Sequence, residues 1–170
     1  GIYVGQSDGV IVRRSRAEYN VAGIEIENTL NADVYDNVTT NNTGGILVFN
    51  MPGLSQQGGN IRVYNNKVVT NNTANFGAKG TPVASVPAGS GIVINSNDDI
   101  EIFDNEIADN ATANIIISSV FFTGYKDSEQ SKTFDPYPER IHVHSNKLSG
   151  GGDSPDGMDL KALKLAMFGL

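Results

Sequence analysis

A repeat with a period of 22 residues is the feature that most constrains the fold of this chain. Gly23-Ile24-Glu25-Ile26 follows the pattern of Gly1-Ile2-Tyr3-Val4 at a distance of 22 residues. The same pattern returns at residues 45–48, 91–94 and 114–117. A fixed period in the twenties with short alternating strands is typical of a solenoid, in which each repeat packs on its neighbours.

Each repeat predicts three short strands. Apolar residues spaced by two point to the same side of a strand, so each pair is expected to face inward. The first strands carry Ile2/Val4, Ile24/Ile26, Ile46/Val48, Ile92/Ile94 and Ile115/Ile117, the second carry Val10/Val12, Ala32/Val34, Ile61/Val63, Ile100/Ile102 and Ile141/Val143, and the third carry Ala17, Thr39, Val68, Ile107 and Leu148. This pattern predicts an all-β fold, a right-handed single-stranded parallel β-helix with about five rungs of 22 residues.

Asparagine recurs at two fixed places in the repeat. One column is Ser15, Asn37, Asn66, Asn105 and Asn146, and the other is Asn20, Asn42, Asn71 and Asn110 with Gly151 in the last turn. Asparagine tolerates left-handed backbone conformations at turns, and stacked amides can hydrogen-bond one another. We therefore predict asparagine ladders with a structural role.

Three insertions interrupt the β-helix, which is expected to span residues 1–157, at residues 51–59, 73–90 and 119–139. The outward column of the first sheet turns apolar at Leu47, Val93 and Ile116. Because an exposed apolar column would be adhesive, we expect one of the two longer insertions to lie over it. The third insertion holds five aromatic residues expected to pin it to the body: Phe121, Phe122, Tyr125, Phe134 and Tyr137.

The tail, residues 158–170, changes to a helical period. Leu160, Leu163, Ala166 and Met167 share one face, which predicts a short helix that caps the last rung. The preceding Asp153-Ser154-Pro155-Asp156-Gly157 is a weak match to a calcium loop; it lacks a Gly-Gly-x-Gly-x-Asp series, so a turn with a helix N-cap is expected and no cofactor is predicted. No cap is visible at the N-terminal rung, which suggests either missing sequence or a partner that stacks end to end.

Composition excludes several classes of function. The net charge of −7 and pI of about 4.7 argue against nucleic-acid binding. The absence of cysteine excludes disulfides and thiolate chemistry, and no apolar run reaches the length of a membrane span. The chain starts inside a strand pattern without a visible signal peptide, so we interpret it as a fragment or processed product.

The repeats resemble those of bacterial right-handed parallel β-helix proteins. The resemblance rests on Gly23-Ile24-Glu25-Ile26-Glu27-Asn28, residues 41–48, Val86-Pro87-Ala88-Gly89 and Asp135-Pro136-Tyr137-Pro138-Glu139, and it extends nearly to the tail. It implies an exported, extracytoplasmic protein of the pectin-lyase-like superfamily. That superfamily includes pectate and alginate lyases, mannuronan epimerases and periplasmic helpers of copper-enzyme maturation, so the resemblance implies fold more strongly than function.

The outer face of the second sheet carries the candidate ligand-binding residues. We define its charged column as Ile11, Asp33, Arg62, Glu101 and His142, and its aromatic column as Arg13, Tyr35, Tyr64, Phe103 and His144. Aligned rings could stack on sugar faces while Arg62, Glu101 and His142 bond hydroxyls or uronate carboxylates. Alternatively, the rings cover one another, Arg62 pairs with Glu101, and the histidines are solvated. The His142–His144 spacing could bind a metal, but Glu101 is the only further ligand in sight, so no metal site is predicted.

A catalytic alternative centres on Tyr137, Glu139, Arg140 and His142. The segment Asp135–Glu139 resembles the Asp-Pro-His-Asp stretch of mannuronan epimerases without its histidine. A tyrosine or histidine could abstract the proton α to a uronate carboxylate that arginine neutralises. Three hypotheses follow: a non-catalytic scaffold that binds polysaccharide or a protein, a uronan lyase or C5-epimerase, and a self-assembling solenoid.

Overall fold

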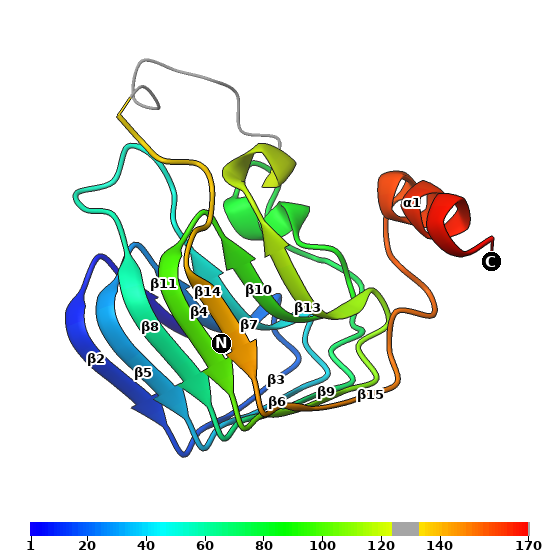
Figure 1. Cartoon of the computed structure of the whole chain (residues 1–170), viewed down its shortest axis with the longest axis horizontal. Helices are drawn as coiled ribbons and strands as arrows, with labels where there is room; N and C mark the ends of the chain where they lie inside the picture. Colours follow the sequence, from blue (N-terminus) through cyan, green and yellow to red (C-terminus); the bar gives the residue numbers. More distant parts are fainter. Residues whose placement is uncertain (124–132, 170) are drawn as a thin grey trace.

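The computed structural model describes residues 1–123 and 133–169, and its strands form three parallel five-stranded sheets (Figure 1). The first sheet contains β1 (Ile2–Gly5), β4 (Ala22–Glu27), β7 (Gly44–Phe49), β10 (Ser90–Asn95) and β13 (Ala113–Ser118). The second contains β2 (Asp8–Arg13), β5 (Leu30–Tyr35), β8 (Gly59–Tyr64), β11 (Asp98–Phe103) and β14 (Ile141–His144). The third contains β3 (Arg16–Glu18), β6 (Val38–Thr40), β9 (Lys67–Val69), β12 (Glu106–Ala108) and β15 (Lys147–Ser149).

Register between successive turns confirms the predicted parallel β-helix. Ile24 lies beside Ile46, and Ile46 beside Ile92, in the first sheet. The inward side chains of all three sheets form one buried core, which includes Ile61, Ile102 and Val68. β-Branched residues suit this core because they pack closely on a pleated surface.

Two asparagine ladders run along the turns, as predicted. In the first, Asn66 Nδ2 donates to Asn105 Oδ1 at 3.0 Å, and Asn66 Oδ1 accepts from Asn37 Nδ2 at 3.0 Å. Both residues that flank Asn66 in the ladder are buried. The second ladder ends differently from the sequence expectation: Asn110 Nδ2 donates to Asn114 Oδ1 at 2.9 Å, so Asn114 takes the place assigned to Gly151.

The insertion at residues 73–90 lies over the first sheet, as expected from the apolar column. Val86 packs in one buried cluster with Leu47, Phe49 and Val93. The third insertion is pinned by Phe134, which is buried against Met51 and Val120. Phe121 and Tyr137 instead contact each other and are about half exposed. Tyr125 lies outside the described residues, as do residues 124–132 of this insertion and the side chain of Phe122.

The predicted C-terminal helix is present as α1 (Met158–Phe168), and two short 3-10 helices occur at Pro82–Ser85 and Val120–Thr123. α1 lies beside the first sheet (Figure 1). Leu160 and Leu163 line a cavity of about 400 Å³ there together with Phe49. This placement leaves Val143 and Leu148 of the last rung exposed. End-to-end stacking stays a prediction.

The N-cap of α1 lies within Asp153–Gly157, as expected. Gly157 occupies the N-cap position, without a side-chain hydrogen bond. Asp156 serves another purpose: its Oδ2 accepts from the backbone N–H of Ala88 at 3.0 Å, and its own N–H donates to Thr112 Oγ1 at 2.8 Å. The carboxylate therefore ties the tail to the insertion that covers the first sheet.

Glu25 on β4, which lies between β1 and β7 in this covered sheet, makes stability depend on pH. Burial, with repulsion from Glu27, raises its pKa from 4.5 to about 7. The folded chain therefore holds a proton that the unfolded chain has lost, and stability falls as pH rises from about 4.5 through 7. After allowance for partial solvent screening, we expect Glu25→Gln to raise the free energy of unfolding by about 1–2 kcal/mol above pH 8 and to change it little at pH 4.

Urea unfolding across this pH range measures the effect. Glu106→Gln is the control, because Glu106 is an exposed carboxylate that pairs with Lys67 on the third sheet. A gain from Glu25→Gln that is equal at pH 4 and pH 8 would contradict the assigned cause.

Candidate functional site

The outer face of the second sheet, called the binding face below, brings the predicted charged column together. Asp33, Arg62, Glu101 and His142 are in register on the adjacent strands β5, β8, β11 and β14. Arg62 and His142 are exposed, and Asp33 and Glu101 are half-buried. Each side chain points outward because it alternates with the inward apolar pair of its strand.

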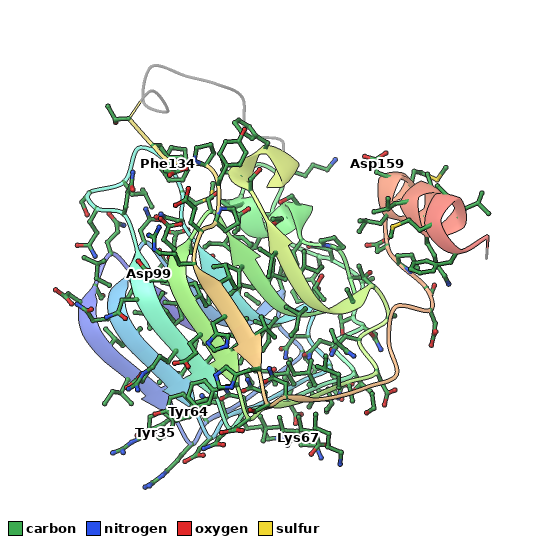
Figure 2. The ribbon with its side chains drawn as sticks, viewed as in Figure 1. Tyr35, Tyr64, Lys67, Asp99, Phe134 and Asp159 are labelled. Atoms are coloured by element: carbon green, nitrogen blue, oxygen red, sulfur yellow. The ribbon has the colours of Figure 1, made fainter. Side chains whose placement is uncertain are left out.

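The aromatic column forms a continuous stack. The ring centroids of Tyr35 and Tyr64 are 4.9 Å apart with planes 10° from parallel, and those of Tyr64 and Phe103 have the same separation. His144 continues the stack 5.2 Å from Phe103. Figure 2 shows Tyr35 and Tyr64 side by side at the ends of their strands.

This stacking agrees with the alternative in which the rings cover one another, and it leaves no face of an inner ring open to a sugar. Tyr64 lies between Tyr35 and Phe103, and Phe103 lies between Tyr64 and His144, so both faces of each inner ring are covered. The spacing follows from the strand separation of about 4.8 Å, which places in-register rings in contact. The column therefore presents ring edges and tyrosine hydroxyls to a ligand.

The ion pairs of the charged column also differ from those expected. Arg62 Nε and Nη2 donate to the two carboxylate oxygens of Asp33 at 2.7 and 2.8 Å. The hydrogen bond with Asp33 is the main cause of a raised Arg62 pKa. Glu101 contacts His144 instead, with Oε1 3.0 Å from Nε2. A bidentate contact to Asp33 matches the planar guanidinium better than a single contact to Glu101.

A third polar column was missed from the sequence. It consists of Asn31, Asn60, Asp99 and Arg140, all with left-handed backbone, at φ 54°, 57°, 56° and 55°. Asn60 Nδ2 donates to Asn31 Oδ1 at 2.6 Å. The sequence position that identifies this column is the residue directly before each inward pair of the second strand. Asparagine and aspartate at this position are a signal because they tolerate a left-handed backbone. Figure 2 shows Asp99 at the strand end opposite to Tyr64.

The catalytic set is spread over separate contacts. Arg140 donates to Asp99 Oδ1 at 2.6 Å, to Asp98 Oδ2 at 3.1 Å and to Glu139 Oε2 at 2.9 Å. The hydrogen bond with Asp99 raises the Arg140 pKa and lowers that of Asp99. The Tyr137 ring instead meets Phe121 edge-on at 6.2 Å. Arg140 is thus engaged by carboxylates of its own chain, and a proton-transfer role for the set stays a prediction.

One cluster on the binding face has the composition of a metal site. The ligand atoms of Glu101, His142 and His144 all lie within 4.8 Å of one another. Glu101 is opposite His142 in register, and His144 follows two residues later on the same strand. All three residues were considered together in the sequence, where they were too few to predict a metal site; the structure shows that their ligand atoms do converge.

Among the described residues, none of the helices combines the length and the apolar character that crossing a bilayer requires.

Comparisons with known proteins agree with this architecture. Neither the comparison with curated proteins nor that with solved structures gave a match. The model of one family, described as "Right handed beta helix region", matches residues 1–127 of the 170-residue chain. The chain therefore belongs to the right-handed β-helix family.

Proposed function

We propose that the chain is a non-catalytic β-helix that binds a neutral, hydroxyl-rich polysaccharide along the binding face. One observation carries the proposal: the first sheet is covered by the insertion at residues 73–90, whereas the second sheet presents an open grid of polar groups. The grid has three columns on successive rungs, namely the charged column, the aromatic column and the column from Asn31 to Arg140.

The chemistry of the grid favours sugar over protein. Protein interfaces bury an apolar centre, whereas the central rungs of this face offer an ion pair of Asp33 and Arg62 beside tyrosine hydroxyls. Carboxylates, guanidinium groups and hydroxyls together supply both acceptors and donors for hydroxyl groups. The regular spacing repeats these groups once per rung, which suits an extended polymer with repeating units.

Neutral polymers are favoured over uronans. The guanidinium of Arg62 is engaged by Asp33, and that of Arg140 by Asp98 and Asp99, so neither charge is free for a uronate carboxylate. The chain also carries a net charge of −7, which repels polyanions. Because the ring faces are covered, a bound polysaccharide contacts the ring edges and the tyrosine hydroxyls.

Affinity electrophoresis in gels that contain a soluble neutral glucan or a uronan tests the proposal, with EDTA present throughout. We expect the glucan gel to retard the chain and the double variant Asp33→Ala/Arg62→Ala to weaken binding about tenfold or more, or about 1.4 kcal/mol. Removing both partners leaves no unpaired charge, so the variant should stay folded.

The matched control is Lys67→Ala/Glu106→Ala. It removes an ion pair of the third sheet, which faces elsewhere on the coil (Figure 2). The proposal for the binding face would be rejected if the glucan gel retarded the unmodified chain and both double variants equally. It would also be rejected if both double variants lost the same amount of glucan affinity. Capture of a protein partner with no polysaccharide bound would move the function to protein recognition.

We place this binding outside the cytoplasm, where structural polysaccharides are found and where the β-helix proteins that this chain resembles act. Fractionation of cells that express the full-length protein checks this location. A cytoplasmic pool alone would exclude an extracellular polysaccharide as the ligand.

A further inference from the structure

We propose that Glu101, His142 and His144 bind one divalent transition-metal ion at the last rung of the binding face. The proposal does not depend on polysaccharide binding. Imidazole nitrogens and carboxylate oxygens are ligands of Zn²⁺, and imidazole also suits Cu²⁺. Three protein ligands leave a further position for water or for a donor atom of another molecule.

Strand geometry brings the three groups together from distant parts of the sequence. His142 and His144 point to the same side of β14 because they are two residues apart, and their ring centroids are 4.3 Å apart. Glu101 lies on the adjacent strand β11, directly opposite His142. These are the two histidines of the whole chain, so any site with two imidazoles must form here.

Contacts at both ring nitrogens and a parallel aromatic ring fix the His144 side chain. Its Nε2 is 3.0 Å from Glu101 Oε1, and its Nδ1 is 3.0 Å from Ser145 Oγ. When Nε2 gives its lone pair to a metal ion, Nδ1 keeps the proton and donates it to the serine hydroxyl. Such a hydrogen bond from the second ring nitrogen fixes the tautomer and direction of metal-binding histidines. Phe103 supports the ring from one side, 5.2 Å away and parallel within 2°.

Nearby positive charges are already engaged, which leaves the Glu101 carboxylate for a metal ion. Arg62, the neighbour of Glu101 in the charged column, forms its bidentate pair with Asp33. Arg140, two residues before His142, contacts Asp98 and Asp99. Glu101 therefore faces the two imidazoles as its main partners.

The distances suit tetrahedral coordination after a small adjustment. Ligand bonds of about 2.0–2.1 Å place two donor atoms about 3.3 Å apart. The separation of 3.0 Å between Glu101 and His144 is close to this value. The ligand atom of His142 is at most 4.8 Å from those of Glu101 and His144. Since His142 is exposed and lies on the edge strand of the sheet, rotation of its side chain can bring this atom to coordination distance.

Calorimetric titration of the untagged chain with Zn²⁺, Cu²⁺ and Mg²⁺ tests the site. We expect saturable one-to-one binding of Zn²⁺, tighter binding of Cu²⁺ and none of Mg²⁺, which prefers oxygen ligands. His142→Ala, His144→Ala and Glu101→Gln should each weaken binding at least about tenfold. The electron paramagnetic resonance spectrum of the Cu²⁺ complex should show coupling to two imidazole nitrogens.

Glu106→Gln is the matched control, because it makes the same change on β12 of the third sheet, on the rung of Glu101. Its metal affinity should equal that of the unmodified chain. Absence of saturable binding, or equal weakening by Glu101→Gln and Glu106→Gln, would overturn the proposal and leave Glu101–His144 as an ion pair only. Circular dichroism verifies folding, and if His144→Ala disturbs the aromatic stack, the exposed His142→Ala variant still decides the outcome.

Discussion

Replacing Asn66 with alanine is expected to lower the free energy of unfolding by about 3–5 kcal/mol. Asn66 is buried in the middle of the first ladder. Its Nδ2 donates to Asn105 Oδ1 and to the carbonyl of Val34, at 3.0 and 2.8 Å. Its Oδ1 accepts from the backbone N–H and the side chain of Asn37, both at 3.0 Å. Alanine would remove the bonds to the Asn37 backbone N–H and the Val34 carbonyl. Asn105 Oδ1 keeps the backbone N–H of residue 66, and Asn37 Nδ2 keeps the carbonyl of Val12.

Each orphaned buried group costs about 1–3 kcal/mol, and partial relaxation keeps the total below the simple sum. Urea unfolding measures the loss. Asn72→Ala is the matched control, since Asn72 follows the second-ladder residue Asn71 but is exposed and can exchange its hydrogen bonds for water. We expect this control to cost less than about 1 kcal/mol. Equal effects of the two variants would mean that the ladders do not stabilise the coil.

The sequence was sufficient to predict the register of the coil. A strand has a period of two, so a shift by one residue would turn each inward pair, such as Ile24/Ile26, toward solvent. Once the insertion at residues 51–59 is allowed for, the repeat places Asn37 near Asn66, 29 residues away, without knowledge of any coordinate. In this register the apolar column through Leu47 and Val93 points outward, so the sequence also predicted that another segment covers it. The structure supplies this cover with Val86.

The partners within the outward columns could not be predicted in the same way. Register places Arg62 between Asp33 and Glu101, and both pairings satisfy the sequence pattern. Side-chain geometry decides in favour of the bidentate contact with Asp33. The ring stack is likewise a matter of rotamers, because Tyr64 and Phe103 could point their faces outward without any change in the backbone.

The positions of the loops and of the tail depend on contacts that do not recur from one repeat to the next. The helix at 158–168 follows from its 3.6-residue pattern, but its position depends on the contacts of single residues. The Asp156 carboxylate accepts from the backbone N–H of Ala88, and the Asp156 N–H donates to Thr112 Oγ1. No repeat pairs these residues, so the sequence predicted the helix but placed it over the last rung instead of beside the first sheet.

Replacing Phe49 with alanine is expected to lower the free energy of unfolding by about 3–5 kcal/mol. Phe49 is 1% exposed and lies on the outer face of the first sheet, where it shares a cluster with Leu47, Val86 and Val93. The ring also lines the cavity beside α1. Its removal takes away buried apolar surface and enlarges that cavity, and the cost grows with the volume that neighbouring groups cannot fill.

The variant also tests whether the insertion at residues 73–90 is held by this cluster. Lys79 is an exposed trypsin site inside the insertion. Loss of the Phe49 ring weakens the contact with Val86, so we expect faster cleavage after Lys79 under native conditions. Phe76→Ala is the control, because Phe76 lies in the same insertion but is 61% exposed. If Phe49→Ala were no more destabilising and no faster to cleave than Phe76→Ala, the insertion would not be a fixed cover, and the first sheet would become a second open face.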